Sequence, residues 1–121
     1  MRKTMILAAL LATASPAFAA SYPVAGQWGV SASTEKGAID CAKLRVIGFN
    51  GDTRTDSGGG VPAYRNVSVS PQGPNEFRVV DVFTSGQIRN GRTNFVLKQI
   101  DDDHIELHLQ PGGTLKLKRC K

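Results

Sequence analysis

The alternation of apolar and polar residues in the C-terminal third of the chain predicts a run of short strands. Residues 104–109 (HIELHL) and 114–118 (TLKLK) alternate strictly, as a strand with one buried face requires. Residues 93–100 (TNFVLKQI) form a third apolar-rich segment. The intervening segments 101–103 (DDD) and 111–113 (PGG) are poor strand formers that tolerate turn dihedrals. The pattern therefore predicts three consecutive strands joined by tight turns.

Shorter segments of the same kind precede this third of the chain. Trp28 is the expected core anchor of the first of them, and residues 85–92 contain Asn90-Gly91, the strongest two-residue hairpin signal. Residues 53–66, which include three successive glycines and Pro62, predict a long irregular loop. The earlier predicted strands are residues 26–32, residues 39–49, a strand that begins at Val67 and Val69, and residues 76–84.

This spacing of strands and turns predicts an all-β fold. After the N-terminal segment no stretch has a helical period, and about seven to eight short strands are separated by turn residues. Such a pattern is typical of a small antiparallel barrel or sandwich of meander-like connectivity. We expect a closed or nearly closed barrel in which the first and last strands meet.

The N-terminus has the features of a secretory signal peptide. Arg2 and Lys3 precede the apolar residues 5–11, and Ala17-Phe18-Ala19 forms a small-x-small cleavage site. We expect a signal peptide (residues 1–19), an N-terminal tail (residues 20–24) and a single β domain (residues 25–121). Neither this apolar run nor a later one is long enough to span a bilayer, so we expect a periplasmic or secreted monomer.

Charge and cysteine content narrow the function classes. Removal of Arg2 and Lys3 lowers the formal net charge from +5 to +3, which is too weak an excess to indicate nucleic-acid binding. Cys41 and Cys120 form an even pair in an exported chain, which favours a disulfide. The bond would close a loop of roughly 80 residues and contribute about 4–5 kcal/mol at most. Metal ligation by the pair is the alternative, although neither cysteine has a partner at C-x-x-C spacing.

Metal-binding and catalytic sites are not expected. His104, Glu106 and His108 share one strand face, but residues four apart lie about 13 Å apart along a strand, too far for one ion to bind both histidines. We read them as a solvated polar face, and we expect no metal, no cofactor and no enzymatic activity. The glycine-rich loop lacks the spacing of a phosphate-binding loop. It is either a flexible surface loop or a recognition loop that presents Tyr64 and Arg65.

A basic patch is predicted around the disulfide. If residues 39–49 form one strand, Cys41 shares a face with Lys43 and Arg45. On the last strand, Cys120 shares a face with Lys116 and Lys118, so the bond would lie on the outside of the barrel among these cations. The patch is either a solvated basic face or a surface for an anionic envelope component, such as an acidic protein or lipopolysaccharide phosphates.

The opening of the domain carries a resemblance. An export signal, a short tail and Ala25-Gly26-Gln27-Trp28 at the start of about a hundred residues resemble the bacterial metalloprotease inhibitors of the alkaline-proteinase-inhibitor type. The resemblance implies a small periplasmic antiparallel barrel, similar in outline to lipocalins. It also implies that residues 20–24, with Ser21 and Tyr22, enter a protease cleft.

Three function hypotheses follow. The first is a binding or inhibitory module that contacts a protein, such as a protease, through the tail or the loop at residues 53–66. The second is a lipocalin-like carrier with a cavity for a small ligand. The third is a structural envelope protein with no discrete site. Trp28, Phe77, Phe83 and Phe95 are available to fill the barrel, which favours a packed interior.

Overall fold

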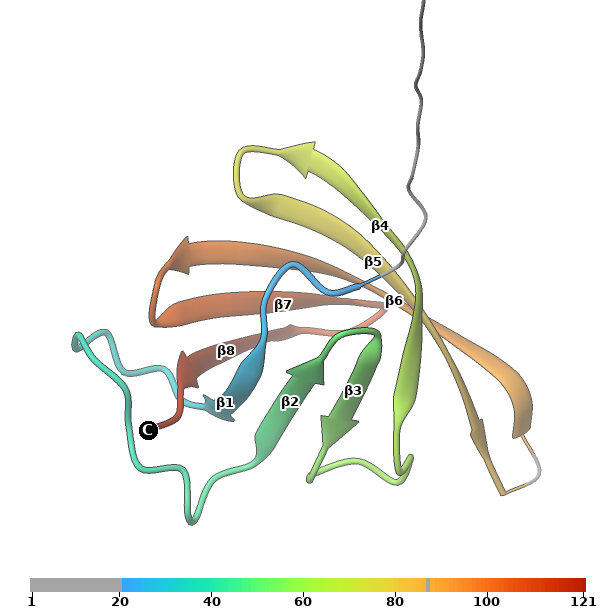
Figure 1. Cartoon of the computed structure of the whole chain (residues 1–121), viewed down its shortest axis with the longest axis horizontal. Helices are drawn as coiled ribbons and strands as arrows, with labels where there is room; N and C mark the ends of the chain where they lie inside the picture. Colours follow the sequence, from blue (N-terminus) through green and yellow to red (C-terminus); the bar gives the residue numbers. More distant parts are fainter. Residues whose placement is uncertain (1–20, 87) are drawn as a thin grey trace, which may run out of the picture.

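Eight antiparallel strands close into one barrel in the computed structural model, which describes residues 21–86 and 88–121 (Figure 1). The predicted signal peptide and Ala20 lie outside the described residues. The strands are β1 (Gly26–Val30), β2 (Val46–Asn50), β3 (Thr53–Asp56), β4 (Tyr64–Gly73), β5 (Glu76–Ser85), β6 (Ile88–Asp101), β7 (His104–Gln110) and β8 (Thr114–Arg119). The predicted all-β class and the predicted closed barrel are confirmed.

Each strand pairs with its neighbours in the chain, and the barrel closes between β1 and β8. In that closing pair Trp28 lies opposite Arg119 and Val30 lies opposite Leu117. The barrel therefore has two distinct ends. The β1–β2, β3–β4, β5–β6 and β7–β8 connections lie at one end, here called the pocket end, and the β2–β3, β4–β5 and β6–β7 turns lie at the opposite end. Within the described residues, no helix is long and apolar enough to cross a membrane.

The core lies inside the barrel and follows the alternation of the strands. Ile105 and Leu107 on β7 and Leu117 on β8 are each about 1% exposed, as the period of two predicts. The other buried apolar side chains are Tyr22, Trp28, Ile47, Phe49, Val79, Phe95 and Leu97. The turns predicted at residues 101–103 and 111–113 separate β6 from β7 and β7 from β8.

The long second strand predicted at residues 39–49 is wrong in its first half. Only β2, from Val46, is a strand, and the preceding residues form a long connection that crosses the outside of the barrel (Figure 1). Gly29 explains how this connection lies so close to β1, because a Cβ at Gly29 would stand 2.7 Å from the Cys41 sulfur and 2.9 Å from Leu44 Cδ1. The apolar side chain of Leu44 therefore covers β1 instead of belonging to a strand face.

The irregular segment predicted at residues 53–66 contains a strand. β3 pairs with β2, and only residues 57–63 form a loop. The segment TRTD has no apolar alternation because its inward positions carry Arg54 and Asp56. These two residues lie opposite Phe49 and Ile47 of β2. A strand with charged inward residues has no hydrophobic period from which to predict it.

The Asn90-Gly91 pair does not form the hairpin turn that the sequence predicts. The β5–β6 turn lies before Ile88, with Gly86 at φ 56°, and Asn90-Gly91 lies within β6. Gly91 faces Phe83 across the hairpin, and a Cβ at Gly91 would lie 2.5 Å from the Phe83 ring. The glycine therefore makes room for an aromatic ring, and Asn90 adopts a φ of 57° beside it.

The N-terminal tail is partly buried. Tyr22 is 7% exposed, its ring meets Phe49 edge-on at 5.0 Å, and its backbone N–H donates to the Gly51 carbonyl at 3.0 Å. Tyr22 therefore packs into the barrel, although the sequence places it in a tail ahead of the β domain. Ser21, immediately before it, is exposed.

Candidate functional site: a pocket at one end of the barrel

A pocket of ≈ 340 Å³ lies at the pocket end, between β2, β3, β6, β7 and β8. An eight-stranded barrel is just wide enough either to be filled by side chains or to hold one small ligand. Because of this pocket, the interior of the barrel is packed only in part. The apolar side chains that line the pocket are Ile47, Phe95, Leu107, Leu109 and Leu115. The polar ones include Arg45, Arg54, Asp56, Tyr64, Arg92 and Thr93.

Arg54 is the central polar residue of this pocket. Its side chain is 8% exposed, and its Nε donates to Asp81 Oδ2 at 2.7 Å. The guanidinium carbon lies 3.8 Å from the centre of the Tyr64 ring and 5.0 Å from that of Phe95, which fixes the plane of the guanidinium. Asp81 has a fully buried side chain and also accepts a hydrogen bond from the Asn66 amide at 3.1 Å. The pairing offsets the cost of burying both charges.

Several polar atoms at this site have no partner among the described residues. The two terminal nitrogens of Arg54 make no hydrogen bond there, although its Nε does. The Thr93 Oγ1 atom is buried and also lacks a partner in the described part of the chain. Of these atoms only Thr93 Oγ1 is buried, and a buried polar atom normally has a hydrogen-bond partner. The Thr93 hydroxyl and the terminal nitrogens of Arg54 can therefore bind a ligand that enters the pocket.

Arg45 and Arg92 add to the positive charge of the pocket. Arg45 binds Asp56 through two hydrogen bonds of 2.9 and 2.6 Å. Burial alone would raise the pKa of Asp56, but the hydrogen bonds from Arg45 and from the Gly58 N–H outweigh it and lower that pKa. Arg92 is exposed and takes part in no ion pair between described residues. Three arginines against Asp56 and Asp81 leave the region with one net positive charge.

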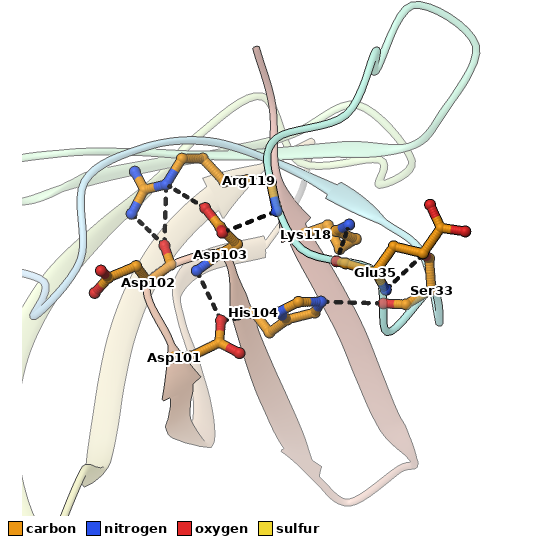
Figure 2. Close-up of polar contacts among 9 residues, drawn as sticks. Ser33, Glu35, Asp101, Asp102, Asp103, His104, Lys118 and Arg119 are labelled. Atoms are coloured by element: carbon orange, nitrogen blue, oxygen red, sulfur yellow. Dashed lines mark hydrogen bonds and ion pairs between the residues drawn. The ribbon is translucent and has the colours of Figure 1, made fainter.

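The H-x-E-x-H strand has a structural role in the described part of the molecule. His104 Nδ1 lies 2.8 Å from Asp101 Oδ1, and its Nε2 lies 3.2 Å from the Ser33 carbonyl (Figure 2). His108 Nε2 lies 3.0 Å from Glu106 Oε1 and its Nδ1 lies 3.1 Å from Thr114 Oγ1. Across residues 21–86 and 88–121, no three His, Cys, Asp or Glu side chains group closely enough to hold a metal ion.

The β1–β2 connection is fastened to the outside of the barrel. Figure 2 shows Lys118, only 1% exposed, beneath the connection, where its Nζ donates to the Glu35 carbonyl. The Gly37 N–H donates to Asp103 Oδ2 at 3.1 Å. The Cys41–Cys120 disulfide, with Cα atoms 5.6 Å apart, joins the same connection to the end of β8. The predicted pairing of the cysteines, outside the barrel, is therefore present.

The basic patch predicted around this disulfide is not assembled as expected. Lys43 and Lys116 are exposed, but Lys118 is buried beneath the connection. Arg45 binds Asp56 at the pocket. The prediction placed Cys41, Lys43 and Arg45 on one strand face, and the strand itself begins only at Val46.

The other candidate binding residues are also separated. Tyr64 is half-buried in the pocket against Arg54, whereas Arg65 points outward on β4 and is exposed. Ser21 is exposed while Tyr22 belongs to the core. Tyr64 and Arg45 therefore lie at the pocket, although the sequence singled out Tyr64 as part of a recognition loop and Arg45 as part of a basic patch.

Sequence reasoning missed Arg54, Asp81 and Thr93. One signal was available, because Asp81 interrupts the apolar segment VVDVF and a carboxylate there needs a buried partner. Which cation would supply that partner depends on the strand order, which pairs β3 with β4 and β4 with β5.

No family model, curated protein or solved structure matches the chain.

Proposed function

We propose that this protein binds a small amphipathic molecule with one negative charge in the pocket at the end of its barrel. The observation that carries the proposal is Arg54, a nearly buried arginine whose terminal nitrogens have no partner among the described residues and whose surroundings are apolar on one side. An apolar pocket with a few convergent polar groups is the usual form of a small-molecule site.

The charge count sets the class of head group. One net positive charge at the pocket is balanced by a monoanion, whereas a dianion would leave an uncompensated charge in a partly desolvated site. A carboxylate also matches the planar fork of two arginine nitrogens and can accept two parallel hydrogen bonds from Arg54. Thr93 Oγ1 is available as a further donor.

The walls set the class of the remaining part of the ligand. Phe95, Leu107 and Leu109 offer apolar contact beyond the head group, and the volume of ≈ 340 Å³ lies at the lower end of the usual range for ligand sites. A short acyl chain or an aromatic ring would fit these walls. Protease inhibition through the N-terminal tail has less support, because Tyr22 is held in the core.

Calorimetric titration of the mature protein with octanoate, octanol, octylamine and octyl phosphate tests the proposal. We expect octanoate to bind at least tenfold more tightly than octanol, because only the anion uses Arg54. Octylamine should bind most weakly. Equal affinity for all four compounds, or no heat with any anion, would contradict the proposed site.

Two variants locate the binding. Leu109→Trp should fill the pocket and abolish octanoate binding while the protein stays folded. Arg92→Gln should weaken octanoate several-fold, whereas the matched variant Arg78→Gln, which lies on β5 beside the opposite end of the barrel, should not. Octanoate binding that survives Leu109→Trp would place the ligand elsewhere.

A further inference from the structure

His104 joins the β1–β2 connection to the β6–β7 turn. Its ring lies between two oxygen atoms, because Nδ1 lies 2.8 Å from Asp101 Oδ1 and Nε2 lies 3.2 Å from the Ser33 carbonyl oxygen (Figure 2). The His104 side chain is 16% exposed, so both contacts are largely shielded from water. We call the arrangement of Asp101, His104 and Ser33 the His104 bridge.

The two oxygens of the bridge fix the number of protons on the ring. A backbone carbonyl and an ionised carboxylate can only accept hydrogen bonds. The hydrogen bond from His104, followed by that from the Asp103 N–H, lowers the pKa of Asp101, so this carboxyl group is ionised near neutral pH. A neutral imidazole has one N–H, which leaves its other nitrogen facing an oxygen, lone pair against lone pair. Only the doubly protonated ring of His104 donates to both oxygens.

His108, the other histidine of the chain, has contacts of a different kind. Its Nε2 lies 3.0 Å from Glu106 Oε1, and its Nδ1 lies 3.1 Å from Thr114 Oγ1. A threonine hydroxyl can donate as well as accept. A neutral ring that carries its proton on Nε2 therefore satisfies both contacts of His108, so the two histidines differ in the number of protons that their contacts require.

The charged neighbours of His104 act in both directions. Lys118 lies directly opposite on β8 and disfavours a second proton on the ring, but its Nζ donates to the Glu35 carbonyl. Asp101 favours that proton and is in direct hydrogen-bonding contact with the ring, so it has the larger effect. The other charged residues of this region, on β7, β8, the turn and the connection, are Glu106, Lys116, Arg119, Asp102, Asp103, Glu35 and Lys36.

The His104 bridge is one of three hydrogen bonds that fasten residues 33–37 to the barrel. Lys118 Nζ donates to the Glu35 carbonyl, and the Gly37 N–H donates to Asp103 Oδ2 at 3.1 Å. A pocket of ≈ 160 Å³ lies beside this segment and is lined in part by Ser33 and His104. Of the side chains that make these three bonds, histidine is the one that ordinarily titrates between about pH 5 and pH 8.

We propose that the His104 bridge is a pH-sensitive fastening of the β1–β2 connection, closed when both ring nitrogens carry protons and open when one proton is lost. Because the closed bridge requires the second proton, residues 33–37 are held most firmly at acid pH and loosen as the ring loses that proton on a rise in pH. The Cys41–Cys120 bond continues to hold the far end of the connection. This device does not depend on the ligand proposed for the pocket.

Nitrogen-15 NMR of the mature protein between about pH 5 and pH 8 tests the protonation directly, since protonated and bare ring nitrogens have different chemical shifts. Both ring nitrogens of His104 should stay protonated up to a pH at which His108 already has one bare nitrogen. Loss of the His104 proton before that of His108, or of both protons together, would overturn the proposal. This measurement uses the unaltered protein and therefore decides even if a variant fails to fold.

The protection factor of the Gly37 amide in hydrogen exchange tests the fastening, because this ratio to the unfolded-chain rate removes the intrinsic effect of pH. It should fall about fivefold between about pH 5.5 and pH 8, the factor that one hydrogen bond of ordinary net strength supplies. In His104→Gln it should be low at both pH values, whereas the matched control His108→Gln should follow the wild type. An unchanged factor in the wild type, or the same fall in His104→Gln, would contradict the proposal.

Discussion

Tyr22 connects the N-terminal tail to the polar interior of the barrel. Burial, followed by the negative charge of Asp81, raises the pKa of its hydroxyl well above the ordinary value. Its oxygen is buried and has no hydrogen-bond partner among the described residues. The aromatic ring therefore stabilises the fold through its contact with Phe49, while the hydroxyl contributes no hydrogen bond.

Substitutions at Tyr22 should separate the ring from the hydroxyl. Tyr22→Ala should lower the free energy of unfolding by about 3–5 kcal/mol, as for other buried aromatic residues. Tyr22→Phe should leave it unchanged or raise it by up to about 1 kcal/mol, because an unpaired buried hydroxyl is removed. Urea unfolding at neutral pH measures both. A loss of several kcal/mol in Tyr22→Phe would show that the hydroxyl is bonded.

The raised pKa also predicts an alkaline loss of stability. In the unfolded chain a tyrosine ionises near pH 10, whereas the folded protein keeps Tyr22 neutral beyond that point. Its contribution is therefore complete below about pH 10 and is lost as the pH rises further. The slope of unfolding free energy between pH 9 and pH 11 should be smaller in Tyr22→Phe than in the wild type. Equal slopes would contradict the assignment.

The Arg54–Asp81 pair should behave as a unit. Asp81→Ala leaves Arg54 buried without its partner and should lower the unfolding free energy by about 3–5 kcal/mol. The double variant Arg54→Met with Asp81→Leu should recover most of that loss, since apolar residues of similar size can replace a buried ion pair. It should still fail to bind octanoate, which would separate the stabilising role of the pair from its binding role.

At the scale of elements, the strands with apolar alternation could be predicted from the sequence and the others could not. β7 and β8 alternate because their inward positions are Ile105, Leu107 and Leu117. β3 places Arg54 inward, so it carries no apolar period. The disulfide could be predicted from composition, but the pocket required knowledge of which strands are neighbours. Polar residues become a site only after the register brings them together.

Gly91 belongs to the Asn90-Gly91 pair that the sequence predicts as a hairpin turn, but the structure places this glycine against the Phe83 ring. A methyl group at Gly91 would overlap the Phe83 ring, so Gly91→Ala should lower the unfolding free energy by about 1–3 kcal/mol. Gly60→Ala is the matched control, because nothing lies within 4 Å of a Cβ there and its φ is not positive. Thermal unfolding of both variants compares them. A neutral Gly91→Ala would show that the hairpin shifts freely to accommodate the added methyl group.

At the scale of the whole molecule, the long β1–β2 connection ties the closing pair of strands together from outside. Lys118 and the Cys41–Cys120 bond hold it against β8, and the Gly37 N–H holds it against Asp103 in the β6–β7 turn. β1 and β8 are the first and last strands of the barrel, so without this connection the barrel would open most easily between them. The covalent bond and the buried lysine place the strongest reinforcement at that junction.

With the β1–β8 junction reinforced, the β3–β4 junction is the weakest strand pairing in the barrel. β3 and β4 are in register at only two positions, Thr53↔Arg65 and Arg54↔Tyr64, and the second of these belongs to the pocket. Amide hydrogen exchange should therefore be fastest in β3 among the strands and slowest in β6. Octanoate bound to Arg54 should slow exchange in β3 and leave β8 unchanged. The β1–β8 junction beside the disulfide would then stay closed, while the barrel opens between β3 and β4, where Arg54 would bind the ligand.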